Sequence, residues 1–195
     1  MVQRKKPEIR AAIIDAADGL FRKNGYAFTT MSAIARQANT SPANIYVYFD
    51  SKLDILLAVY EPWLKARIEM LAEHARQFTE AETRLKVVLK AIWHEIPSDD
   101  NCFANNLVQA LAVVRSQGAL PRNLLRWCES QITEVICEAL PEERRHIAED
   151  GHLAHLVFMA YDGFAVHNNL SGPSDRIDDV VELATALILG RDRAA

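Results

Sequence analysis

The sequence predicts an all-α protein, with a head of three short helices followed by a larger helical body. Two observations lead to this prediction. Apolar residues recur at steps of three and four along most of the chain, and no segment shows the strict alternation of a half-buried strand. Turn residues such as Asn-Gly, Ser-Pro and Ser-Gly-Pro divide the pattern into about nine helices, of which three short ones come first.

The first two helices are delimited by turn and capping residues. Apolar residues line one face over residues 8–24, and Gly25 ends this helix because glycine adopts a positive φ without strain. A second, short helix is expected over residues 31–38. Thr30 precedes it and is a plausible N-cap, because its hydroxyl can accept from a free amide of the first turn.

The third helix follows after a turn of only a few residues and runs from Pro42 to Tyr48. Ser41 can cap it, and proline suits the first helical position, where no amide donor is needed. On this helix Ile45 and Phe49 are four residues apart and can face inward. Asn44 and Tyr48 share a second face, with Pro42 and Tyr46 nearby.

The body begins with a long apolar stripe from Leu53 to Leu71, in which Pro62 predicts a kink near Tyr60. Thr79 and Glu82 have the spacing of a capping box and open the next helix. Further helices are expected up to Pro97, from about residue 98 to Gly118, from Pro121 to Pro141, from Gly151 to the Ser-Gly-Pro break, and over residues 177–188.

The bulk composition excludes several classes of protein. The chain has 195 residues, half of them hydrophobic and a quarter charged, as in soluble globular domains. No apolar run approaches the roughly 20 residues that span a bilayer, and no secretory signal is recognisable. The three cysteines are odd in number and widely spaced, which favours a reducing, cytoplasmic location over a disulfide framework.

The net charge of −4 is unevenly distributed. Residues 1–52 carry eight Lys and Arg against four Asp and Glu, a balance of +4, whereas the remainder carries 14 against 22, a balance of −8. A basic head on an acidic body suggests that the head meets a polyanion.

A helix pair joined by a tight turn is typical of a helix-turn-helix unit, in which the second helix of the pair enters the major groove of DNA. An asparagine such as Asn44 can pair with adenine through both atoms of its amide. The hydroxyls of Tyr46 and Tyr48 can reach phosphates while their rings pack on sugars, and Lys52 is a further phosphate contact. The free amides near Thr30 offer another anion contact.

The segment FTTMSAIARQANTSPANIYVYFDSKLDIL resembles the DNA-binding signature of the TetR family of bacterial regulators, over about residues 8–57. The resemblance implies a homodimeric repressor that leaves its operator when a small molecule binds the body. Two positions depart from the usual pattern: Asn39 stands where glycine is common in the turn, and Ala43 where glycine is common in the third helix. Asparagine tolerates the left-handed conformation, so we expect the turn to be kept.

The expected architecture is therefore a helix-turn-helix domain over residues 1–51 and a ligand-binding and dimerisation domain over residues 52–195. The partners expected are a double-stranded, (pseudo)palindromic operator, a small hydrophobic effector and a second copy of the chain. No cofactor, metal or enzymatic activity is expected. The expected DNA contacts are Thr30, Ser41, Pro42, Asn44, Tyr46, Tyr48 and Lys52.

The body contributes two further sets of candidates. The resemblance to the TetR family implies that the last two helices pair with their copies as a four-helix bundle, and the apolar and small residues of these helices fit that pairing. The alternative is that they are buried wholly within the monomer. The expected interface residues are Leu156, Ala160, Gly163, Phe164, Val180, Ala184 and Leu187. By analogy with the family, the effector pocket is expected among the middle helices, although each candidate could instead be core: Trp63, Met70, Phe78, Trp93, His94, Phe103, Asn106, Trp127 and Met159.

Other functions are less well supported by the sequence. A helical-bundle enzyme would need a motif such as paired Glu-x-x-His, which is absent. An architectural DNA binder without a ligand should carry a more basic head. His152 and His155 have helical spacing for a metal pair, but two exposed histidines are the simpler interpretation. Cys128 and Cys137 are about 13 Å apart along a helix, too far for a disulfide.

Overall fold

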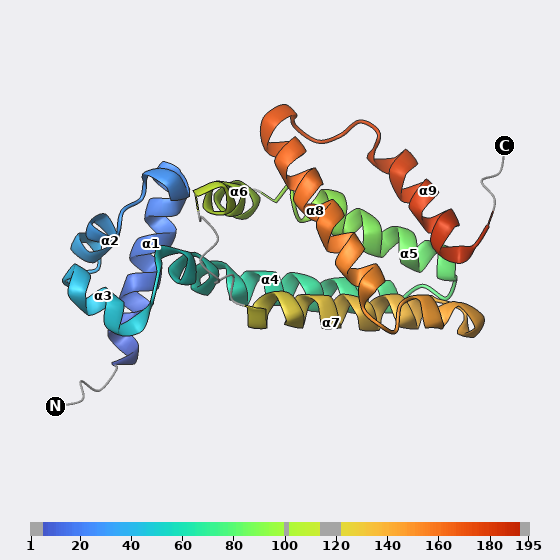
Figure 1. Cartoon of the computed structure of the whole chain (residues 1–195), viewed down its shortest axis with the longest axis horizontal. Coiled ribbons are helices and arrows are strands. Elements are labelled where there is room, and N and C mark those ends of the chain that lie inside the picture. Colours follow the sequence, from blue (N-terminus) through green and yellow to red (C-terminus); the bar gives the residue numbers. More distant parts are fainter. Residues whose placement is uncertain (1–5, 100–101, 114–121, 192–195) are drawn as a thin grey trace. The chain divides into compact units, whose positions relative to one another are not determined.

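The computed structural model describes residues 6–99, 102–113 and 122–191, and within these ranges every regular element is helical. The predicted all-α fold class is confirmed (Figure 1). In chain order the elements are α1 (Pro7–Phe28), α2 (Met31–Gln37), α3 (Pro42–Tyr48), α4 (Lys52–Arg76), α5 (Ala81–Lys90), the π-helical turn η1 (Ala91–Glu95), α6 (Phe103–Val113), α7 (Arg122–Ala139), the 3₁₀-helix η2 (Glu142–Ile147), α8 (His152–Ser171) and α9 (Ile177–Leu189).

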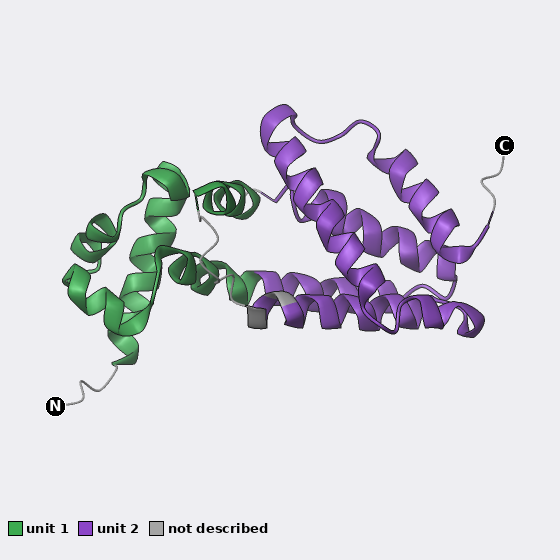
Figure 2. Cartoon of the chain, in the orientation of Figure 1, with its two compact units in different colours: residues 1–63, 100–121 green, residues 64–99, 122–195 purple. Residues whose placement is uncertain are grey.

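The chain divides into two compact units (Figure 2). The head unit comprises Met1–Trp63 and Asp100–Pro121, and the body unit comprises Leu64–Asp99 and Arg122–Ala195. The head unit therefore holds α6 in addition to the first three helices and the start of α4. This association joins segments far apart in the chain, which local periodicity does not reveal.

The core of the head unit is formed by the inward faces predicted for the first three helices. Ile13 and Phe21 of α1, Ile34 of α2 and Ile45 of α3 are all no more than 1% exposed. α6 packs on α1, and its Asn106 is buried there. The Asn106 amide donates to Tyr60 Oη over 3.1 Å, which joins α6 to the start of α4.

Gly25 redirects the chain at the end of α1, three residues before the last residue of that element. Its φ of 75° and ψ of 166° are non-helical and essentially reserved for glycine. The Gln109 side chain of α6 lies against this turn and accepts from Ala27 N over 2.9 Å. The Thr29 hydroxyl donates to the Gly25 carbonyl over 2.8 Å. Two segments distant in sequence are thus joined at a turn whose backbone conformation favours glycine.

α4 continues as one helix through Pro62, although proline cannot donate the usual backbone hydrogen bond. Pro62 is exposed, so water can hydrate the carbonyl that its ring leaves without a donor. α5 also differs from the prediction. It begins at Ala81 after Glu80, with no side-chain cap bond, so the expected Thr79 capping box does not form.

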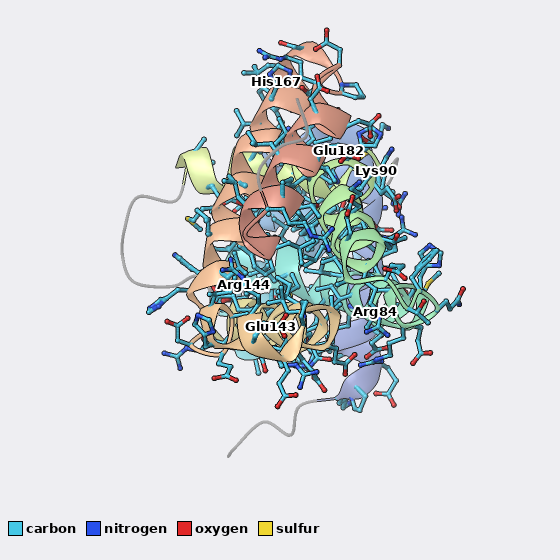
Figure 3. The ribbon with its side chains drawn as sticks, turned by 90° about the vertical axis from the view of Figure 1, so that its right-hand side faces the viewer. Arg84, Lys90, Glu143, Arg144, His167 and Glu182 are labelled. Atoms are coloured by element: carbon cyan, nitrogen blue, oxygen red, sulfur yellow. The ribbon has the colours of Figure 1, made fainter. Side chains whose placement is uncertain are left out.

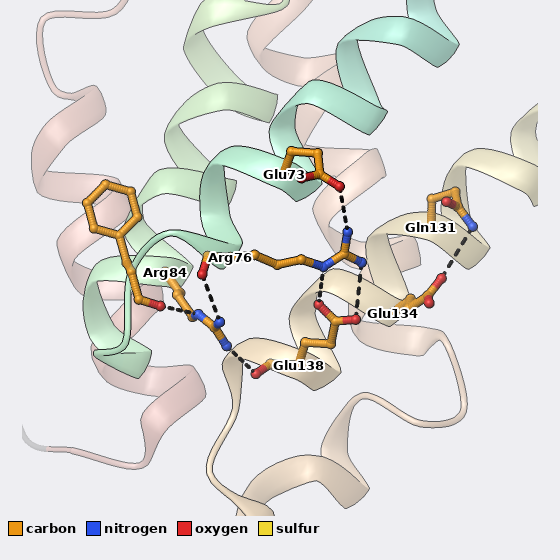
Figure 4. Close-up of polar contacts among 7 residues, drawn as sticks. Glu73, Arg76, Arg84, Gln131, Glu134 and Glu138 are labelled. Atoms are coloured by element: carbon orange, nitrogen blue, oxygen red, sulfur yellow. Dashed lines mark hydrogen bonds and ion pairs between the residues drawn. The ribbon is translucent and has the colours of Figure 1, made fainter.

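An arginine clamp closes one end of the body unit (Figure 4). Arg76 of α4 donates from Nε and Nη2 to the two carboxylate oxygens of Glu138, over 2.8 and 3.1 Å. Arg84 of α5 donates to the carbonyl oxygens of Glu138, Phe78 and Arg76. The Arg84 guanidinium thereby satisfies carbonyls at the ends of α4 and α7, which have no partners within their own helices.

Ion pairs join α5 to α9 on another side of the body unit. Lys86 Nζ lies 2.7 Å from a carboxylate oxygen of Glu182, and Lys90 Nζ lies 2.7 Å from Asp178. Figure 3 labels Lys90 of α5 and Glu182 of α9, one member of each pair. The groups of these pairs are partly to largely exposed, so solvent screens them and their contribution to stability is small.

The π-helical turn η1 interrupts the helix that begins with α5. Ile96 N donates to Ala91 O over 2.9 Å, a bond that spans five residues. Trp93 in this turn is buried, and its indole N–H donates to Val157 O of α8 over 3.0 Å. Its ring stacks on Phe164 with the centroids 5.6 Å apart. The widened turn thus packs against α8. Within the described residues no helix is long and apolar enough to cross a membrane.

We expect Gly25→Ala to destabilise the protein by about 1–3 kcal/mol, because an L-residue is strained at this φ and ψ. A Cβ there would also lie 2.8 Å from Gln109 Oε1. Urea denaturation of the variant measures the loss. Gly19→Ala is the matched control in the same helix, and it should be neutral or stabilising by up to about 1 kcal/mol. A Gly25→Ala protein as stable as wild type would contradict the strain at this turn.

Candidate nucleic-acid interface and effector-binding body

The turn between α2 and α3 is closed by backbone bonds. Asn39 has a φ of 50°, the left-handed conformation expected of it in place of glycine. Thr40 N donates to Ala35 O over 2.9 Å, and Ala38 N donates to Ile34 O over the same distance. The tight turn predicted from the sequence is therefore formed.

Both helices of the pair carry the predicted side-chain caps. Thr30 Oγ1 accepts from Ala33 N, and Ser41 Oγ accepts from Asn44 N, each over 3.1 Å. Both cap residues are exposed. The caps satisfy one amide in each first turn. Pro42 has no amide hydrogen, so Ala43 supplies the remaining amide in the first turn of α3.

The buried and exposed faces of α3 separate as predicted for a helix docked on one side. Ile45 is fully buried and Phe49, just after the helix, is 5% exposed. Pro42 and Ala43 are exposed, and Tyr46 is 55% exposed. Arg10 of α1 lies over the Phe49 ring, with its guanidinium carbon 5.1 Å from the ring centroid.

Tyr48 is half-buried and connects α3 to the start of α1. Its phenol oxygen accepts from Lys6 N over 3.0 Å. An accepted bond leaves the hydroxyl proton free, so the same group can donate to a phosphate oxygen.

Asn44 is turned toward the loop that precedes α3. Its Nδ2 donates to Thr40 Oγ1 over 2.7 Å. Its Oδ1 is buried and has no hydrogen-bond partner. Pairing with adenine would require this side chain to give up the Thr40 bond and rotate outward, so the predicted base contact stays a prediction.

Lys52 lies at the start of α4 and holds the end of α1 in place. Its Nζ donates to Tyr26 O over 2.6 Å and to Thr29 O over 2.7 Å. The ammonium also lies 4.1 Å from the centroid of the Tyr26 ring. Burial lowers the pKa of Lys52. The sequence suggested a phosphate contact at this lysine but gave no signal for its bonds to the carbonyls of a turn 23 and 26 residues earlier.

The candidate pocket residues are divided between the two units. Phe103 is buried in the head unit, with its ring centroid 5.1 Å from that of Tyr60 and 5.2 Å from that of Trp63. Asn106 lies beside Tyr60. Trp93 belongs to the body unit, and so does Trp127, which lies under Lys65 with Nζ 5.3 Å from its ring centroid. His94 and Phe78 are half-buried, and Met70 and Met159 are exposed.

Met70 lines an open groove of about 340 Å³ between α4 and α5. The floor is apolar, with Leu71, Val87 and Ile96, and the rim carries basic groups such as Arg67. Arg67 is paired with Asp99, at 3.5 Å. Of the residues that line this groove, Met70 alone is among the pocket candidates predicted from the sequence. The other lining residues come together through the packing of α4 and α5, which local sequence patterns do not reveal.

An apolar stripe is exposed along α8 and α9. On α8, Leu156 is 65% exposed, Met159 50% and Leu170 77%. On α9, Leu187 is 66% exposed. A Cβ at Gly163 would meet nothing within 4 Å. Of the other expected interface residues, Ala160, Phe164, Val180 and Ala184 are half-buried.

The two histidines considered as metal ligands are paired with carboxylates instead. His152 Nδ1 lies 2.6 Å from Asp150, and His155 Nδ1 lies 2.8 Å from Glu129 of α7. Among the described residues no group of three potential ligands could hold a metal ion.

Comparison with known proteins agrees with this geometry. Residues 13–59 match the sequence model of the family described as bacterial regulatory proteins, tetR family. The head of this chain is therefore similar to the DNA-binding part of TetR-family regulators. The matched residues contain most of α1, all of α2 and α3, and the beginning of α4.

Curated relatives match this chain over part of its length. The fatty acid metabolism regulator protein of Bacillus subtilis (strain 168) is 31% identical over 100 residues, which is 51% of each chain. The transcriptional regulator HbdR of Aromatoleum sp. (strain CIB) is 40% identical over 81 residues, 38% of this chain and 35% of that protein. The matched part thus spans about half or less of these curated relatives.

Solved structures extend the likeness to the whole fold. FadR of Thermus thermophilus, a TetR-family repressor in complex with lauroyl-CoA, aligns over 95% of this chain and 97% of its own. The TM-score is 0.66 and the sequence identity 19%. The helical body after the head is therefore of the same fold as that repressor.

We expect Lys52→Met to destabilise the protein by about 1–3 kcal/mol, because two carbonyl oxygens lose their donor while the aliphatic stem is kept. Thermal or urea unfolding measures the change. Lys23→Met, at an exposed position, is the control and should stay within about 0.5 kcal/mol of wild type. Equal losses in both variants would show that the Lys52 bonds do not stabilise the turn.

Proposed function

We propose that the chain is a homodimeric, ligand-responsive repressor that binds a (pseudo)palindromic operator through α3 and leaves it when a hydrophobic effector binds. The observation that carries the proposal is the capped α2–turn–α3 unit, which lies within the residues matched to the TetR family. Its outward groups are suited to DNA: exposed Tyr46 and a Tyr48 hydroxyl with a free proton.

The charge distribution supports DNA as the partner of the head. The positive balance is confined to the residues that form the helix-turn-helix and its flanks, whereas the rest of the chain is acidic. An acidic body is repelled by the phosphates, so attraction is directed to the head alone. The binding should accordingly weaken as salt rises, because counterions compete with the basic groups.

For the effector we propose a fatty acyl thioester of coenzyme A. The proposal follows the names of relatives: one is a fatty acid metabolism regulator, and a structural neighbour binds lauroyl-CoA. The chemistry is compatible with the body unit, which supplies apolar and aromatic side chains from α5, η1, α7 and α8 for an acyl chain.

The effector is tested together with DNA binding. Genomic fragments from the source organism are selected on the purified protein, and binding of the best fragment is followed by fluorescence anisotropy. Lauroyl-CoA and stearoyl-CoA should weaken DNA binding by at least tenfold at saturation, which corresponds to a coupling free energy of about 1.4 kcal/mol or more. Coenzyme A alone and free laurate are the controls and should have smaller effects.

Two failures would have different meanings. If specific fragments are bound but no acyl thioester releases them, the acyl-CoA assignment is wrong and the DNA-binding function stands. If no fragment is preferred over scrambled DNA, the proposed repressor function is wrong.

For the dimer we propose that the exposed stripe on α8 and α9 packs against its copy. The stripe follows helical spacing, with Leu156, Met159 and Gly163 on α8 and Leu183 and Leu187 on α9. Such a stripe is unfavourable in water but suits a four-helix bundle between two copies. A two-fold dimer would also present two copies of α3 to two operator half-sites.

Leu156→Glu combined with Leu187→Glu should therefore give a monomer, because each change places a charge in the proposed interface. Size-exclusion chromatography with light scattering measures the mass, and operator affinity should fall by more than tenfold. Met70→Glu, at a similarly exposed position outside the stripe, should leave the mass unchanged. A double variant that remains a dimer would place the interface elsewhere.

A further inference from the structure

The exposed face of α3 is apolar, although base readers are usually polar. The helix PANIYVY has no charged residue. Its outward positions near the start are Pro42 and Ala43, both exposed, followed by Tyr46. Guanine is most often read by Arg or Lys, and adenine by Asn or Gln. None of these residue types points outward from α3.

Asn44 is the one side chain of α3 with the donor and acceptor of a base reader, and the fold uses it otherwise. Its Nδ2 donates to Thr40 Oγ1 over 2.7 Å, and its Oδ1 is buried. Its backbone amide donates to Ser41 Oγ. The side-chain and backbone amides of Asn44 thus hold the segment before α3 against the first turn of that helix. Asn44 is therefore a positioning residue.

The major-groove edge that an apolar surface recognises is the C5-methyl group of thymine, the only apolar group that the base pairs present there. We propose that Ala43 and Pro42 read thymine methyl groups in each operator half-site, with Asn44 holding them in place. The inference rests on the proposed DNA-binding function and deepens it, because it names which base the reading helix selects.

The roles within α3 then divide by chemistry. The Ala43 methyl group and the Pro42 ring exclude water from a thymine methyl. Tyr46 and Tyr48 contact the sugar-phosphate backbone, which positions the helix without selecting a base.

The test replaces thymine by deoxyuridine, which removes only the methyl group, in the fragment selected by the full-length protein. Each thymine of one half-site is exchanged in turn, and affinities are measured by fluorescence anisotropy. At one or two positions the exchange should weaken binding about fourfold, because one buried methyl group is worth roughly 0.8 kcal/mol and about 1.4 kcal/mol is tenfold. This arm uses the wild-type protein, so it does not depend on the folding of a variant.

At one of those positions, Ala43→Gly should reduce the ratio of the affinities for the thymine and deoxyuridine fragments to less than about twofold. Ala11→Gly, an exposed alanine to glycine change in α1, is the control and should keep the full ratio. Asn44→Ala should weaken binding to all fragments to a similar degree. If it instead relaxes the preference at a single adenine, Asn44 is a base reader and the proposed division of roles is wrong.

The outcomes separate this inference from the function on which it rests. A selected fragment that binds equally well with uracil at every position overturns the methyl readout while repressor function stands. A protein with no preferred fragment overturns the proposed function itself. A thymine-dependent ratio that Ala43→Gly leaves unchanged overturns the assignment to Ala43.

Discussion

A helix of seven residues is too short to hold its shape in water, so α3 depends on the burial of one face. Ile45 provides most of that burial, and Phe49 extends it just beyond the helix. The caps at Thr30 and Ser41 and the left-handed Asn39 then fix where the two helices of the pair begin and end. What α3 can present to DNA follows from this anchoring, because burial of Ile45 leaves Pro42, Ala43 and Tyr46 exposed.

The fold class, the head and most helix boundaries were predictable from the sequence. Apolar spacing placed Ile13, Phe21, Ile34 and Ile45 in the core, and capping chemistry placed Thr30 and Ser41 at helix starts. These features are local, so a single chain carries their signal. The candidate DNA contacts were likewise found as one cluster, because they lie within one short segment.

What the sequence did not predict depends on contacts between distant segments. α6 joins the head unit through Gln109 and the turn at Gly25, which are 84 positions apart. Lys52 is bound to carbonyls of that same turn, and Asn44 is bound to Thr40 rather than free. The candidate pocket residues are mostly apolar or aromatic but do not share a location, because they are divided between two units. Residue type and spacing predict which side chains can meet a ligand, but not which are already engaged by the fold.

The π-helical turn η1 has a consequence for how this chain is compared with its relatives. A ring closed by five residues holds one residue more than an α-helical ring, so everything after Ala91 is advanced by one position relative to an uninterrupted helix. Relatives with a straight helix here would align with a one-residue gap near Trp93. Alignments that omit this gap would pair the wrong residues within the turn itself.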